Sequence, residues 1–396
     1  MDKGNFYAVN NYFATSLIYH KVAICGHCGT DLQKVKAKKN YCRQVFDIPP
    51  LKVEVTEHRV EVKQCCVCGK ETVAECEIPA SVQYGEGVTS MAIYLNQYQL
   101  LPFERVSETM SDLFNCPISA EVIQQSNELA YERLEHTAEN KIKTSVIKSQ
   151  VMHNDETGIR CEGKTKWIHT YSTTEHTYYA IDDKRGKEAM ERINILPQFK
   201  GISVHDRWAS YDQYHCEHAL CNAHLSRDLK LVHEEYDKPW AATMRTLLFK
   251  AYELSQQENL SVEAFTTIEK QYDKIVDEGI NKESLFPTLC VVGTKKRGRK
   301  TKSESLKLLE CFRNRKKEIM RFLHNKDVPF DNNLAERDLR MIKLKQKISG
   351  CFRTRKGAEI FCRIRSYIST MKKQGGHVWN AIQLTMKTPS LQLIPV

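Results

Sequence analysis

Three acidic residues occupy positions from which a carboxylate could bind a metal ion. Asp155 in VMHNDETG and Asp206 in ISVHDRWASY each follow an apolar run that leads into a polar turn. We therefore expect each at the end of a strand, at the edge of a sheet. Glu336 in FDNNLAERDLR is the third. An aspartate at a strand end is also a common turn-former, and that alternative stays open.

The sequence around Glu336 predicts a helix that packs on a sheet. At helical spacing, one apolar stripe is formed by Ala335, Leu339 and Ile342. The adjoining polar face carries Glu336, Arg340 and Lys343. Glu336 thus lies between core and solvent, where a metal ligand belongs, although a surface ion pair with Arg340 is the alternative. The nearest other carboxylates are Glu156, Asp331 and Asp338.

Two CxxC pairs predict a second kind of metal site. Cys25 and Cys28 precede Gly29, and Cys65 and Cys68 precede Gly69. Two sulfurs at this spacing can bind one side of a tetrahedral Zn²⁺ while glycine lets the backbone turn beneath it. Four thiolates would make the zinc structural. The alternatives are unliganded cysteines, or ligation by others nearby: His27, Cys42 and Cys66.

The elements that must position these residues follow from periodicity. Helices are expected over LPFERVSETMSDLFN and SAEVIQQSNELAYERLEHTAENKIK, with Ser119 as the cap of the second. Helix–break–helix also describes a helix-turn-helix, but without a basic recognition face a helical linker is the preferred interpretation. Strands SQVMHNDET, TKWIHTYST and HTYYAID, then helix GKEAMERINIL and strand GISVHD, predict a mixed α/β core. His153 and His205 are expected to pack beside these strands.

Charge is distributed unevenly along the chain. The net charge is +10, yet residues 291–373 hold 25 Lys and Arg against 8 Asp and Glu. A polyanion such as nucleic acid is one expected partner, and a solvated basic face is the alternative. The most basic stretch contains Lys295, Lys296, Arg297, Arg299 and Lys300. No apolar run approaches the roughly 20 residues of a membrane span, and the N-terminus has no secretory run, so we expect a cytoplasmic protein.

These motifs, in this order, resemble the IS66 family of bacterial insertion-sequence transposases. The resemblance rests on HNDETG, HDRWASY, the Cys221/His224 pair and DNNLAERDLR, of which DNNLAER is the most specific. The two CxxC pairs with FDIPPLKVEV between them resemble the family's zinc-binding region. Two departures are that only about 20 residues precede Cys25, where longer members have an extended region, and that Asn222 replaces the usual Trp.

The resemblance implies a ribonuclease-H-like core with an Asp-Asp-Glu triad at Asp155, Asp206 and Glu336. Those carboxylates would bind Mg²⁺ or Mn²⁺ and catalyse phosphodiester hydrolysis and strand transfer at transposon ends. Implied partners are DNA, both as transposon ends and as target, and further copies of the chain on that DNA in the nucleoid. Expected DNA contacts are the five basic residues above together with Arg340 and Lys343. The alternatives are an inactive zinc-containing DNA-binding protein and a nuclease on the same fold.

The expected domain organisation has six parts. They are a tail (1–20), a zinc module (21–84), a helical linker or DNA-binding region (85–148), the first part of the catalytic core (149–217), a helical insertion with the basic loop (218–322), and the rest of the core with basic C-terminal helices (323–396).

Overall fold

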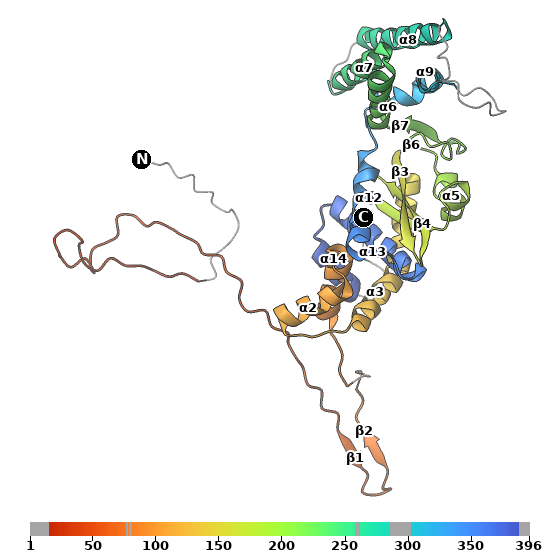
Figure 1. Ribbon diagram of the computed structural model, residues 1–396. Helices are drawn as coiled ribbons and strands as arrows, with labels where there is room; N and C mark the ends of the chain where they lie inside the picture. Colours follow the sequence, from red (N-terminus) through yellow and green to blue (C-terminus); the bar gives the residue numbers. More distant parts are fainter. Residues whose placement is uncertain (1–15, 77, 79–80, 258–261, 286–301, 388–396) are drawn as a thin grey trace. The chain divides into compact units, whose positions relative to one another are not determined.

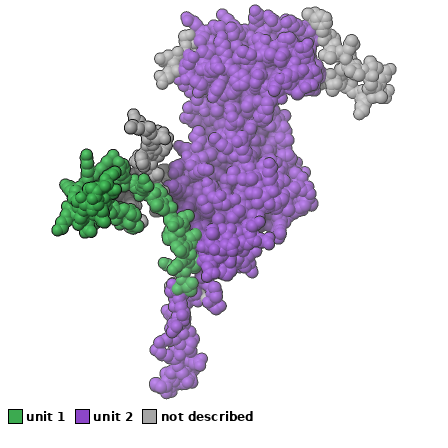
Figure 2. Space-filling view, turned by 60° about the vertical axis from the view of Figure 1, so that its left-hand side comes forward, with its two compact units in different colours: residues 1–55 green, residues 56–396 purple. Residues whose placement is uncertain are grey.

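The computed structural model describes residues 16–76, 78, 81–257, 262–285 and 302–387. The chain divides into two compact units, residues 1–55 and 56–396, which Figure 2 colours separately. The division falls between the two CxxC pairs. Across the described residues, no helix is long and apolar enough to span a bilayer.

A five-stranded mixed sheet forms the centre of the second unit (Figure 1). The strand order is β5-β4-β3-β6-β7, with β3, β4 and β5 antiparallel and β3, β6 and β7 parallel. The strands are β3 (Val151–Cys161), β4 (Lys164–Ser172), β5 (Thr177–Asp182), β6 (Ile202–His205) and β7 (Glu217–Leu220). The prediction of a mixed α/β fold is confirmed. The four predicted strands correspond to β3, β4, β5 and β6. Helix α5 (Lys187–Ile193) and the short 3-10 helix η3 (Leu196–Gln198) connect β5 to β6.

Gly201 lets β6 start directly beside β3. A Cβ at this position would lie 2.5 Å from the carbonyl oxygen of Gln150 and 2.7 Å from that of Ser149. Both contacts are with backbone, which cannot move aside as a flexible side chain could. The backbone of Ile202 donates to Gln150 at 2.8 Å and continues this close approach into the parallel ladder. The glycine of GISVHD therefore fixes where the second acidic strand begins.

Helices before the sheet pack with helices from the end of the chain. The segments are α1 (Glu86–Ile93), the π-helix η1 (Tyr94–Tyr98), α2 (Phe103–Phe114), α3 (Ala120–Leu134), the π-helix η2 (Glu135–Glu139) and α4 (Asn140–Lys148). Ser119 accepts a hydrogen bond from the backbone of Val122, so its predicted capping role is confirmed. Leu134, Ile142 and Val146 share one core with apolar residues of α13 (Arg355–Lys373) and α14 (Val378–Lys387).

The segment after the sheet is helical, with one correction. Residues from His218 were expected to be helical, but Glu217–Leu220 form β7, the parallel edge strand beside β6. Four residues are too few for a periodic signal to distinguish strand from loop. The following helices are α6 (Asn222–Tyr236), α7 (Pro239–Ser255), α8 (Val262–Leu285), α9 (Glu304–Asn314), α10 (Lys316–Ile319) and α11 (Arg321–His324). Together with β6 and β7 they enclose a core of their own.

Helix α12 (Asn333–Ser349) contacts β3 and β4. Ala335, Leu339 and Ile342 are its buried residues, so the predicted apolar stripe is confirmed. Leu339 and Ile342 share a core with Ile159 of β3 and with residues of α13. Because this stripe fixes how the helix is rotated on the sheet, it also fixes where Glu336 points.

Candidate active site

The parallel pairing of β3 and β6 brings Asp155 and Asp206 to the same level of the sheet. The register pairs Met152 with Ser203 and His153 with Val204. Two residues further along each strand are Asp155 and Asp206. Asp206 follows β6 directly, as predicted, but the prediction that Asp155 ends its strand is wrong, because β3 continues to Cys161. Pairing with β4 keeps this polar stretch extended, since Asp155 pairs there with Thr170.

Alternation along β3 separates the two adjacent acids. Side chains of a strand point to opposite faces in turn, so Asp155 shares a face with Ile159, which packs against α12. Glu156 points to the other face. There its side chain is almost fully buried and binds Arg185 at 2.7 Å and the hydroxyl of Tyr211. Glu156 is thus committed to a structural ion pair on the far side of the sheet from α12.

Glu336 lies in the first turn of α12, and the residue before that helix anchors it. The Asn332 side chain accepts from Nδ1 of His153 at 2.9 Å and donates to the carbonyl oxygen of Asn154 at 2.8 Å. Its backbone N–H donates to the Cys221 sulfur at 3.1 Å. Asn332 is 1% exposed, so these are buried hydrogen bonds. They hold the start of α12 against β3 on the face that carries Asp155.

Asp155 lies in a negatively charged, largely buried environment. Burial and the charges of Glu156, Asp206 and Glu336 together raise the pKa of Asp155 to about 7, against a hydrogen bond from the backbone of Glu156 that lowers it. Glu336 also has a buried oxygen, Oε1, without a hydrogen-bond partner among the described residues. Concentrated negative charge and an unpartnered carboxylate oxygen both fit a bound cation.

The loop after Asp206 is held in an unusual conformation. Arg207 has a φ of 73°, in the left-handed region that non-glycine residues seldom adopt. Its guanidinium donates to Asp228 of α6 at 2.9 Å, and the backbone of Trp208 donates to Asp206 at 3.0 Å. The turn thereby orients the Asp206 carboxylate and ties it to the first helix beyond the sheet.

The other acids near Glu336 have structural partners. Asp338 accepts from the hydroxyls of Ser172 and Thr177 and pairs with Lys373 at 2.8 Å. Asp331 accepts from the backbone and side chain of Asn333 at the start of α12. Both carboxylates thus have local partners that account for their positions.

His153 and His205 are buried, so the prediction that they pack beside the strands is confirmed. Nδ1 of His153 donates to Asn332, and burial lowers the pKa of His153 to about 4. His205 lies 3.1 Å from His218, ring nitrogen to ring nitrogen, and burial likewise lowers its pKa. Both rings are therefore neutral at pH 7.

The two cations predicted to contact DNA from α12 have different surroundings. Arg340 is exposed, and Lys343 donates to the carbonyl oxygen of Gly158 at 3.1 Å. Lys295, Lys296, Arg297, Arg299 and Lys300 lie outside the described residues. Glu336 does not approach Arg340 as the surface-pair alternative required. Its Oε1 lies 3.7 Å from Nδ1 of His224 and 3.9 Å from Nη2 of Arg227.

Sequence reasoning missed Asn332 and left the Cys221/His224 pair without a role. No pattern in DNNLAER distinguishes its first asparagine, Asn332, as an anchor. For Cys221 and His224, their C-x-x-H spacing was the only sequence signal of a shared site. Their approach to Glu336, more than a hundred positions away, depends on the tertiary fold.

Each CxxC pair forms a tight turn of the same kind. The N–H of Gly29 donates to the carbonyl of Cys25 and that of Gly69 to Cys65, and both glycines have a φ above 70°. The Thr30 hydroxyl and backbone lower the pKa of Cys28. Backbone groups of Cys68 and Val67 do the same for Cys65, next to the short hairpin of β1 (Val62–Gln64) and β2 (Glu71–Val73). Turns that favour thiolates fit zinc ligation.

Two family models match the chain. One, described as the transposase IS66 family, covers residues 81–360, which is more than half of the chain. The other, described as the zinc-finger binding domain of transposase IS66, covers residues 23–69 and so includes all four CxxC cysteines. No curated protein matches. On these matches, the chain belongs to the IS66 family of transposases.

Proposed function

We propose that the chain is a DNA transposase that hydrolyses a phosphodiester at transposon ends and then joins the freed end to target DNA. The carrying observation is geometric: the register of β3 and β6 brings Asp155 and Asp206 to the same level of the sheet, and Glu336 lies in the first turn of α12, which packs on β3. Burial and the charges of Glu156, Asp206 and Glu336 together raise the pKa of Asp155 to about 7. A bound cation would offset this negative charge and favour the ionised form of Asp155. We assign Asp155, Asp206 and Glu336 as ligands of Mg²⁺ or Mn²⁺.

The chain's own residues determine where the reacting phosphate would sit. Asp155 is fixed inside β3, Asp206 is oriented by the backbone of Trp208, and Glu336 is placed by the anchored start of α12. Mg²⁺ or Mn²⁺ held by these three residues would supply charge stabilisation and an activated oxygen. Water attacks phosphorus at the end of the element and the 3′ oxygen leaves. That 3′-hydroxyl then attacks a phosphate of the target, and the 3′ oxygen of the target strand leaves, so that one phosphodiester forms as another breaks.

The sheet supports a ribonuclease-H-like assignment for the core. Three antiparallel strands are extended by two parallel ones, and the proposed ligands lie on the central β3, on the neighbouring β6 end and on a helix that packs over β3. The first two acids therefore come from adjacent strands, and the third comes from a later segment on the same face.

Zinc and DNA binding complete the proposal. We assign Cys25, Cys28, Cys65 and Cys68 to one structural Zn²⁺, supported by the two matching glycine turns and the zinc-finger family match. Arg340 and Lys343, near Glu336 on α12, are proposed to contact phosphates, together with Lys295, Lys296, Arg297, Arg299 and Lys300. Pairing of two transposon ends would require more than one copy of the chain.

A strand-transfer assay tests this function. Purified chain is incubated with Mg²⁺, or Mn²⁺, a plasmid target and DNA fragments carrying the sequences that flank its coding region. We expect joined products with the wild type and with the exposed control Asp112→Asn, and none with Asp155→Asn. Cutting without joining would instead indicate a nuclease. Binding alone would indicate an inactive DNA-binding protein, and either result would overturn the proposal.

A further inference from the structure

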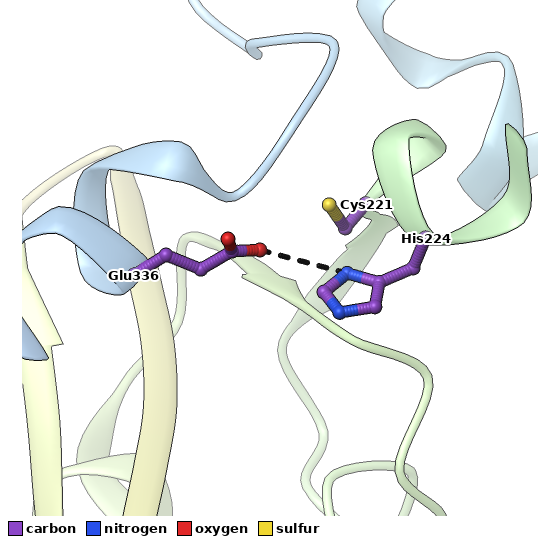
Figure 3. Close-up of side chains that lie close together, drawn as sticks. All are labelled: Cys221, His224 and Glu336. Atoms are coloured by element: carbon purple, nitrogen blue, oxygen red, sulfur yellow. Dashed lines mark ion pairs between the residues drawn. The ribbon is translucent and has the colours of Figure 1, made fainter. Parts of the chain in front are cut away.

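Three potential metal ligands meet beside the carboxylate site, at the junction of α6 and α12 (Figure 3). Cys221 directly precedes α6, His224 lies in its first turn, and Glu336 lies in the first turn of α12. The Cys221 sulfur, a His224 ring nitrogen and a Glu336 carboxylate oxygen all lie within 4.8 Å of one another. Spacing of i and i+3 at a helix start places the first two on one side, toward α12.

Two of the three ligand atoms are buried without a partner. His224 Nδ1 and Glu336 Oε1 face each other at 3.7 Å, too far for a hydrogen bond. Neither atom has a hydrogen-bond partner among the described residues, and neither is accessible to solvent. Buried polar atoms are nearly always satisfied, so a pair of unsatisfied atoms aimed at one point indicates a missing partner.

The spacing matches a tetrahedral ion. Zinc binds nitrogen and oxygen at about 2.0–2.2 Å and sulfur at about 2.3 Å, so two ligands of one ion lie about 3.3–3.6 Å apart. The nitrogen–oxygen separation of 3.7 Å is close to this range. The distances from the Cys221 sulfur to the other two ligand atoms are at most 4.8 Å.

The ligand types select the ion. A thiolate, an imidazole and a carboxylate form a mixed set that suits zinc and not magnesium, which prefers oxygen ligands throughout. Cys221 is already oriented, because its sulfur accepts the backbone N–H of Asn332 at 3.1 Å. Three protein ligands leave one position of a tetrahedron for water or a phosphate oxygen.

A direct ion pair is the competing explanation. A protonated His224, or Arg227 at 3.9 Å, could balance Glu336 electrostatically. The Arg227 side chain is 64% exposed, so it is not confined to this position. An ion pair also does not involve the Cys221 sulfur, which lies within 4.8 Å of both ligand atoms. A metal accounts for all three residues.

We propose that Cys221, His224 and Glu336 bind one Zn²⁺, separate from the zinc of the CxxC turns, that bridges the first helix beyond the sheet to α12. The bridge does not depend on the proposed catalysis. It does share Glu336 with the proposed Mg²⁺ site, so an ion here would fix one oxygen of that carboxylate.

Metal content tests the bridge without any activity measurement. Full-length chain is depleted of metal, reloaded with Zn²⁺, freed of excess ion and analysed. We expect His224→Ala to hold about one zinc per chain fewer than the wild type, and the exposed His233→Ala, on the same helix, to match the wild type. The same decrement should appear in a Cys25→Ser/Cys65→Ser background, since the two sites are separate.

Co²⁺ reloading identifies the ligands. Cys221→Ser should lose part of the sulfur-to-cobalt charge-transfer absorption, whereas the exposed Cys351→Ser should lose none. Glu336→Gln, which keeps the side chain's shape, should weaken Co²⁺ binding, and excess Mg²⁺ should not displace the ion. Equal zinc content and equal cobalt spectra in the wild type, His224→Ala and Glu336→Gln, each verified as folded by circular dichroism, would overturn the proposal in favour of an ion pair.

Discussion

Replacing Asp155 by Asn should stabilise the metal-free protein while it abolishes cleavage. The pKa of Asp155 is raised from 3.8 to about 7 by burial and by neighbouring acids. A shift of about 3 units corresponds to about 4 kcal/mol of destabilisation once the group is ionised. Structural relaxation and residual solvent reduce this, so we expect a gain of about 2–4 kcal/mol at pH 8. Asparagine also keeps the oxygen that accepts from the backbone of Glu156.

The pH dependence has a definite sign. When folding raises the pKa of a carboxyl group, that group has no effect on the free energy of unfolding below its unfolded-state pKa. As the pH rises through the folded-state pKa, ionisation of the buried group lowers the free energy of unfolding. Wild type and Asp155→Asn should therefore be equally stable near pH 4. They should diverge between pH 4 and about pH 7, and the difference should then stay constant.

Thermal unfolding followed by tryptophan emission measures the effect. For a unit of this size the gain corresponds to roughly 3–6 °C in Tm. Magnesium at about 100 times its dissociation constant should then stabilise the wild type by about 2.7 kcal/mol and the variant far less. The exposed Asp112→Asn is the control. If Asp155→Asn is no more stable than the wild type at pH 8, or if Mg²⁺ stabilises both equally, the assignment of Asp155 as an electrostatically strained ligand is refuted.

Three further predictions address other parts of the chain. Cys25→Ser with Cys65→Ser should remove about one zinc per chain, by metal analysis, while circular dichroism of the remaining fold is unchanged; full zinc retention would contradict the assignment. Neutralising the five charges of residues 295–300 should make the salt dependence of DNA binding shallower by up to about 4.5 in log–log slope, and an unchanged slope would mean that these residues do not contact DNA. Asn332→Ala leaves the His153 ring and a β3 carbonyl without partners. It should cost about 1–3 kcal/mol in urea unfolding, and a cost below 0.5 kcal/mol would show that Asn332 does not anchor α12.

Periodicity predicted most of the regular elements because each is long enough to show its apolar pattern. The apolar stripe of α12 and the Ser119 cap are local features, and both were predicted. Strand β7 was missed because its four residues pair only through β6. In β3, the polar run after His153 resembles a turn by composition, but its pairing with β4 keeps it extended through Cys161.

The same limit applies to the candidate site. Residue types and motif order led to Asp155, Asp206 and Glu336, and alternation along β3 explains why the adjacent Glu156 is excluded. Which face each acid occupies depends on strand register, and a one-residue slip would exchange Asp155 for Glu156. Periodicity within a segment carries no information about that register. Pairing with β4 and β6 determines it.

The position of Glu336 depends on polar contacts as much as on the apolar stripe. The stripe fixes the rotation of α12 about its axis but permits sliding along β3. Asn332 removes that freedom, because its hydrogen bonds to His153, to the Asn154 carbonyl and to the Cys221 sulfur can be made together at only one axial position. His153, which bonds to Asn332, is neutral because burial lowers its pKa to about 4. Its ring therefore adds no positive charge near the three carboxylates. A residue outside the three proposed metal ligands thus sets the position of Glu336 along β3.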